Sequence, residues 1–104
     1  MIEISTAKIV RVIFLSREYG PDSPHVHDYI ASLNYDEKSS LVALMWVGRE
    51  TYAPDEFDKA KAQAEAEATA PTEEYLSGNP DLAGHLESGL DLLGIDVTQV
   101  EDTM

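Results

Sequence analysis

The sequence of 104 residues contains no cysteine. This absence excludes a disulfide framework, a thiolate nucleophile, and zinc or iron–sulfur sites built on cysteine ligands. The longest unbroken apolar stretch has seven residues, Leu41 to Val47. A membrane-spanning helix needs about 20 such residues. The first residues also lack the basic region and cleavage site of a secretory signal peptide. We therefore expect a cytoplasmic protein without a membrane span.

Basic residues are scarce, with seven Lys and Arg against 20 Asp and Glu, which gives a net charge of −13 at pH 7. Nucleic acids and anionic membranes require a basic surface, so neither is expected as a partner. Residues 1–61 hold all seven basic residues and ten acidic ones, a net charge of −3. Residues 62–104 hold ten acidic residues and no Lys or Arg, a net charge of −10. This asymmetry indicates either a surface for a basic protein partner or a face that confers solubility.

The length fits one domain, which we place at residues 1–94, followed by a loosely ordered tail at 95–104. Capping residues, prolines and glycines divide this domain into five main helices and one short helix, an all-α compact bundle. The predicted helices cover about residues 6–19, 24–33, 35–47, 54–70, 72–77 and 81–93. The β-branched residues within 8–15 leave an alternative open, an α+β fold with an N-terminal strand there.

The apolar pattern predicts how these helices pack. The first and third helices are apolar around most of their circumference, so we expect them to pair in the core. Gly48 is predicted to end the third helix, and Gly94 the last one. The fourth helix presents a small-residue stripe for close packing, formed by Ala53, Phe57, Ala60, Ala64 and Ala68. The last helix presents a leucine stripe with Gly89 on the same face, formed by Leu82, Leu86, Leu90 and Leu93.

The histidines and acidic pairs do not form a metal-binding pattern. His25 and His27 would point about 200° apart on a helix, and no third ligand is fixed beside them. His85 lies at the border of the leucine stripe and lacks the Glu-x-x-His pattern of di-metal sites, because Leu82 stands three residues before it. The acidic pairs fall mostly at helix starts, where they favour the helix dipole. We predict no metal site and no cofactor.

Catalytic motifs are also missing, since the chain has no nucleophile elbow, no P-loop and no dinucleotide fingerprint. An enzyme is therefore the less favoured class, and we name no catalytic residue. The binding candidates are four residues around the end of the third helix: Trp46, Arg49, Tyr52 and Tyr75. An arginine flanked by aromatic side chains is a typical anchor for an anion or a partner's carboxylate. The competing interpretation is structural, with Trp46 in the core and Arg49 tied to the acidic half.

Two motifs resemble those of a known family. The first is Leu41-Val-Ala-Leu-x-Trp46-x-Gly-Arg49 followed by Phe57, and the second is Tyr75-Leu-x-Gly-x-Pro80-x-Leu-x-x-x-Leu86-x-x-Gly-Leu90-x-x-x-Gly94. They are similar to a small bacterial family, found mainly in alphaproteobacteria and known only as a domain of unknown function. The resemblance covers about Thr6 to Gly94. It implies a helical, cytoplasmic, single-domain protein and brings no activity, cofactor or site residue.

From these observations we expect a non-catalytic interaction or regulatory module that uses its acidic C-terminal half, about Glu65 to Asp91. The partner would be a protein with a basic surface or a second copy of the chain. One alternative is a small-molecule-binding protein or enzyme with a pocket near Trp46, Arg49 and Tyr75. Another is a DNA-mimic or antitoxin-like acidic protein, which would need carboxylates spaced in two phosphate-like rows.

Overall fold

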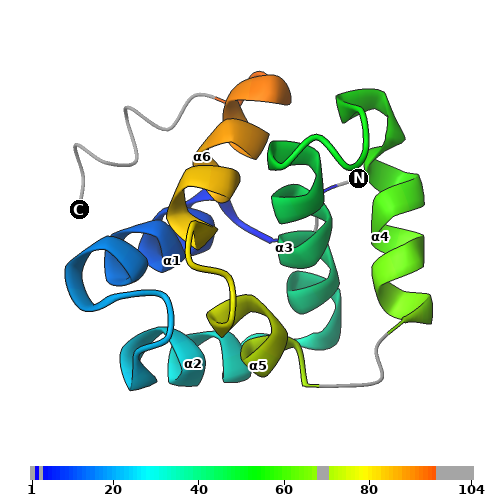
Figure 1. Cartoon of the computed structure of the whole chain (residues 1–104). Coiled ribbons are helices and arrows are strands. Elements are labelled where there is room, and N and C mark those ends of the chain that lie inside the picture. The colour runs from blue at the N-terminus through cyan, green and yellow to red at the C-terminus, as the bar shows by residue number, and fades with distance from the viewer. Residues whose placement is uncertain (1, 3, 68–70, 96–104) are drawn as a thin grey trace.

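The computed structural model, which describes residues 2, 4–67 and 71–95, is all-α, as the sequence predicted (Figure 1). The described residues contain no strand. The alternative of an N-terminal strand at 8–15 is therefore wrong, because those residues lie inside the first helix. The elements are α1 (Thr6–Tyr19), α2 (Pro24–Ala31), α3 (Tyr35–Gly48), the single 3-10 turn η1 (Pro54–Glu56), α4 (Phe57–Ala66), α5 (Thr72–Ser77) and α6 (Leu82–Leu92).

Polar side chains cap the starts of the first three helices. The Ser5 hydroxyl accepts a hydrogen bond from the Lys8 amide at 3.2 Å, and Ser23 serves α2 in the same way. At α3, the Asn34 side chain accepts from the Glu37 amide at 2.8 Å. The Glu37 carboxylate in turn accepts from the Asn34 amide at 3.0 Å. These contacts satisfy amides that have no partner within the helix, which fixes where each helix begins.

Helix α3 lies at the centre of the bundle. Every residue from Leu41 to Val47 is buried. α6 packs on one side of α3 and α4 on the other, while α2 and α5 pack together below them (Figure 1). The expected pairing of the first and third helices is wrong, since α1 packs mainly against α6 and α2. α1 is less enclosed than its composition suggests, because the Phe14 side chain is 48% exposed.

Two glycines let α6 approach α3 closely. A β-carbon on Gly89 would stand 2.5 Å from the Leu44 carbonyl oxygen, and one on Gly48 would lie against the backbone of α6. Side chains at either position would therefore hold the two helices apart. Gly89 faces the core together with the leucine stripe, as predicted. This contact allows α6 to cover the face of α3 that α1 was expected to fill.

The small-residue stripe of α4 packs on the opposite side of α3. Phe57, Ala60 and Ala64 are buried there, as expected. Ala53 is exposed instead, because it precedes the 3-10 turn and is not part of α4. Ala68 and residues 96–104 of the predicted tail at 95–104 lie outside the described residues. No helix in the described part of the chain is long and apolar enough to cross a membrane.

Candidate functional site

Three of the four binding candidates come together where α3 ends. The Trp46 indole Nε1–H donates a hydrogen bond to the Tyr75 hydroxyl oxygen of α5 at 2.9 Å. The Trp46 and Tyr52 rings stack, with their centroids 5.8 Å apart and an angle of 26° between their planes. Trp46 is only 8% exposed, whereas Tyr75 is 40% exposed. Trp46 thus belongs mainly to the core, and Tyr75 presents its outer face to solvent.

Arg49 is the C-cap residue of α3. It follows Trp46 by three positions, the spacing at which helix side chains are neighbours. Its Nε donates a hydrogen bond to the Thr51 hydroxyl at 3.3 Å, and the side chain is exposed. Arg49 forms no ion pair with any other residue that the structure describes. A role for Arg49 in binding an anion stays a prediction.

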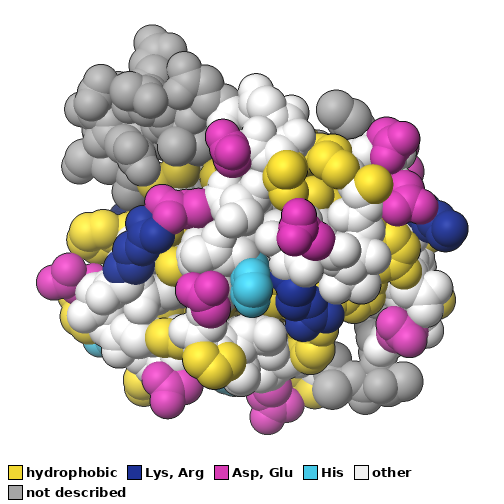
Figure 2. Space-filling view, turned by 45° about the horizontal axis from the view of Figure 1, so that its top comes forward, with side chains coloured by type: hydrophobic (Ala, Val, Ile, Leu, Met, Phe, Trp, Pro, Cys, Tyr) yellow, Lys and Arg dark blue, Asp and Glu magenta, His cyan; other side chains and the backbone are white. Residues whose placement is uncertain are grey.

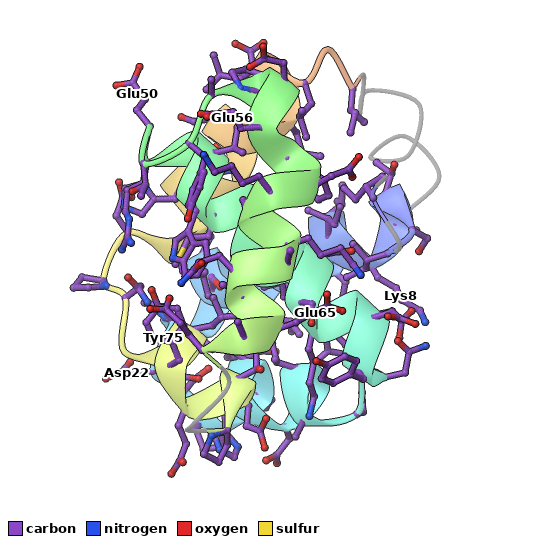
Figure 3. The ribbon with its side chains drawn as sticks, turned by 90° about the vertical axis from the view of Figure 1, so that its right-hand side faces the viewer. Lys8, Asp22, Glu50, Glu56, Glu65 and Tyr75 are labelled. Carbon is purple, nitrogen blue, oxygen red and sulfur yellow. The ribbon has the colours of Figure 1, made fainter. Side chains whose placement is uncertain are left out.

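The turn after α3 positions Tyr52 over Trp46. The Glu50 amide donates to the Val47 carbonyl at 3.0 Å, and the Thr51 amide donates to the Trp46 carbonyl at 2.9 Å. Glu50 has a positive φ of 65°, a left-handed conformation that normally favours glycine. Glu50, not Gly48, is therefore the residue that reverses the chain here. Figure 3 shows the Glu50 side chain projecting away from the body of the protein.

The histidines lie at the α1–α2 corner and on α6. The His25 ring stacks on the Tyr19 ring, with centroids 3.9 Å apart and 27° between the planes. His27 Nδ1 lies 3.3 Å from a carboxylate oxygen of Asp28. No group of three or more potential metal ligands occurs within residues 2, 4–67 and 71–95. His25 and His27 thus have local contacts, and His85 lies at a half-buried position.

A cavity of about 220 Å³ lies at the junction of α3, α4 and α5. It is distinct from the predicted pocket position, because neither Trp46, Arg49 nor Tyr75 lines it. Sequence reasoning missed it, since its walls come from three segments with no shared motif. The described residues that line it are Tyr35, Lys38, Ser39, Val42, Ala64, Pro71, Thr72 and Glu73. Its lining thus combines apolar side chains with one oppositely charged pair.

Ion pairs connect the two halves whose charge differs so strongly. Lys38 Nζ lies 3.2 Å from Glu73 Oε1 at the edge of the cavity. Arg17 of α1 binds Glu87 of α6 through both of its terminal nitrogens. A hydrogen bond from its own backbone amide, together with Lys38, lowers the pKa of Glu73. The hydrogen bond from Arg17 lowers the pKa of Glu87 in the same way. Basic residues of the first 61 positions thus neutralise part of the acidic half.

Only some carboxylates of the acidic half are neutralised in this way. Glu65 is one more of these, because Lys61 Nζ lies 3.3 Å from its carboxylate. Four acidic residues between 62 and 95 form no ion pair with another described residue: Glu67, Glu74, Asp81 and Asp91. All four are exposed. On the face shown in Figure 2, most acidic side chains are dispersed among other groups, and they do not form two rows.

Comparison with known proteins identifies the family and adds no activity. No curated protein matches the chain, and no solved structure matches it. A family model described as "Protein of unknown function (DUF3775)" matches residues 23–95. The match begins before α2 and ends after α6, so it includes the aromatic cluster, both α3–α6 glycines and the lining of the cavity. The chain therefore belongs to the DUF3775 family of proteins of unknown function.

Proposed function

We propose that the protein is a non-catalytic interaction module that binds a partner protein with a basic surface. The observation that carries this proposal is the set of uncompensated carboxylates at Glu67, Glu74, Asp81 and Asp91. Neighbouring acidic residues such as Glu73 and Glu87 are neutralised by basic residues from the other half. The remaining charge is exposed and available for complementary charge on a partner.

The charge pattern favours a protein partner over the alternatives. A DNA mimic would present carboxylates in two rows that imitate the phosphates of a duplex, whereas Figure 2 shows them dispersed on that face. A small-molecule site near Trp46 would need polar groups converging on a hollow. There, the Trp46 indole N–H is already engaged by the Tyr75 hydroxyl. At a protein interface, exposed charges of this kind steer a complementary partner during encounter and contribute to specificity.

Salt dependence tests this proposal. The chain is immobilised and used to capture partners from the source cell at about 0.05 M and about 0.5 M salt. Screening shortens the reach of exposed charges to a few ångströms at the higher concentration. Capture of a specific protein should fall strongly at high salt. Capture that does not change with salt would refute the electrostatic basis.

A matched pair of variants locates the surface. The first variant combines Glu67→Lys, Glu74→Lys and Asp91→Lys, which reverses unpaired charges of the C-terminal half. The control combines Glu18→Lys, Asp22→Lys and Asp55→Lys, which makes the same change in net charge among exposed residues of the first half. We expect the first variant to lose the captured protein and the control to retain it. Equal loss in both variants would mean that only the net charge matters.

A further inference from the structure

Two of the uncompensated carboxylates follow residues that line the cavity at the junction of α3, α4 and α5 closely in the sequence. Glu67 is three positions beyond Ala64, which lines the cavity, and Glu74 directly follows Glu73. Tyr35, which is 59% exposed, is one of the residues that line the cavity. A recess and an exposed tyrosine thus occur together, with unpaired negative charge on residues close to the lining in the sequence.

The size of the cavity favours a single side chain as its occupant. Pockets for drug-sized ligands usually enclose about 300–1,000 Å³. The 220 Å³ here is smaller, and Val42, Ala64 and Pro71 supply apolar walls. Binding energy at protein interfaces is concentrated where one large side chain fills such a pocket, and tyrosine is enriched around these positions. A partner's leucine or aromatic side chain matches this volume and lining.

The charges around the cavity indicate which partner residues would lie next to the inserted side chain. Lys38 is engaged by Glu73, and Lys61 is engaged by Asp36 and Glu65 at 3.5 Å and 3.3 Å. Glu67 and Glu74 have no basic partner among the residues that the structure describes. The unpaired charge on the residues that neighbour the cavity lining in the sequence is therefore negative. It complements lysine or arginine next to the inserted side chain.

We propose that the cavity between α3, α4 and α5 is the anchor pocket of the interaction surface. It takes one large apolar side chain from a partner segment that carries basic residues on either side. This inference rests on the proposed function and names the partner chemistry at that surface. The apolar anchor supplies most of the affinity, and the flanking basic residues orient the segment on Glu67 and Glu74.

A synthetic peptide tests the pocket directly. The probe is a fluorescently labelled seven-residue peptide with a central leucine and three lysines on each side, titrated with the full chain by fluorescence anisotropy. A second peptide has alanine in place of the leucine. We expect the leucine peptide to bind at least tenfold more tightly than the alanine peptide. Equal affinity, or no binding of the leucine peptide at about 1 mM protein, would overturn the proposal.

Variants of the chain assign the binding to this cavity. Tyr35→Ala removes an exposed part of the cavity wall and should lower the affinity of the leucine peptide at least tenfold. Tyr19→Ala, which removes a similarly exposed tyrosine on α1, should leave its affinity unchanged. Thr72→Trp fills the cavity from its half-buried rim and should also weaken binding. Circular dichroism checks that each variant is folded. Unchanged affinity in both folded cavity variants would overturn the proposal.

The outcomes separate this inference from the proposed function. Lysine peptides that bind through Glu67 and Glu74, regardless of the central residue and of Tyr35, would support the acidic surface and overturn the anchor pocket. Dimerisation in light scattering that Tyr35→Ala abolishes would assign the cavity to a second copy and overturn the stated partner. Capture that does not depend on salt and that the charge variant retains, together with tight binding of the leucine peptide, would support the pocket and refute the electrostatic basis of the function.

Discussion

Gly48 of α3 lies directly against the backbone of His85 in α6. A β-carbon at position 48 would stand 1.7 Å from the His85 carbonyl oxygen, and 2.9 Å from the Gly89 amide nitrogen. Both obstacles are backbone atoms, so neither can be relieved by rotating a side chain. The contact explains why α6, rather than α1, covers this side of α3.

Gly48→Ala should therefore destabilise the protein strongly. Overpacking of a core costs about 1–3 kcal/mol, and a clash with backbone belongs at or above the upper end of that range. The measurement is urea unfolding followed by circular dichroism. Gly78→Ala is the control, because a β-carbon there would meet the Tyr75 carbonyl oxygen at an ordinary 3.5 Å. If the two variants are equally stable, the close approach of α3 and α6 is wrong.

Tyr75→Phe should leave the indole N–H of Trp46 without its protein partner. The hydrogen bond measures 2.9 Å, and Trp46 is almost fully buried. Losing the partner of a buried donor costs about 1–3 kcal/mol, and the half-exposed position of Tyr75 places the effect near the lower value. Urea unfolding gives the cost, and the emission of this single tryptophan reports the altered contact. Tyr19→Phe, a control on α1, should change neither; an equal shift would contradict the assignment.

Glu50→Gly should stabilise the protein. Glu50 has a φ of 65°, which costs a residue with a β-carbon about 1–2 kcal/mol. Glycine adopts this conformation freely but loses more backbone entropy on folding, so the net gain is about 0.5–1 kcal/mol. Thermal unfolding measures it. Glu67→Gly provides the contrast, since Glu67 has a φ of −98° and glycine should destabilise there. A loss of stability in both variants would rule out strain at Glu50.

Acid should weaken the link between α1 and α6. The hydrogen bond from Arg17 lowers the pKa of Glu87 below its ordinary value of 4.5. The stabilisation from this pair is therefore complete above that value and disappears as the pH falls through the lower pKa of the folded state. Glu87→Gln should cost about 0.5 kcal/mol at pH 7, as expected for an exposed pair, and nothing once Glu87 is protonated in the parent.

Melting temperatures between pH 7 and pH 2 provide the test of that link. The parent and Glu87→Gln curves should converge at the acid end. Ser88→Ala, a change at an exposed and uncharged position of the same helix, should run parallel to the parent throughout. Curves for Glu87→Gln and the parent that stay equally far apart at every pH would show that the pair is not the source of the difference.

Local features of the fold were predictable from the sequence, whereas the packing partners were not. The helix starts at Ser5, Ser23 and Asn34 were predictable because each cap side chain binds an amide only three residues further along the chain. Gly94 ends α6 with a φ of 73°, as expected for a C-terminal glycine. Gly48 is the last residue of α3, as predicted, but the requirement for glycine there comes from the contact with His85, 37 positions along the chain. A single sequence carries no sign of such a distant contact.

The candidate site shows the same division. The proximity of Trp46 and Tyr52 follows from their spacing across one turn. Tyr75 is 29 positions from Trp46, and their hydrogen bond depends on how α5 docks. The charge difference between the halves was evident, but pairs such as Lys38 with Glu73 reduce it in space. The cavity could be found only from the structure, because α3, α4 and α5 each contribute only part of its wall.

The central position of α3 has a consequence for the order of events during synthesis. Residues Leu41 to Val47 leave the ribosome well before Leu82 to Leu92, which form the helix that covers them. Until α6 has emerged, the most apolar segment of the chain is buried mainly on the side that packs against α4, and its other side stays exposed to solvent. We therefore expect the domain to close late, in one step, when the last helix docks. A nascent chain that stalls before residue 82 would expose a stretch that chaperones and proteases recognise.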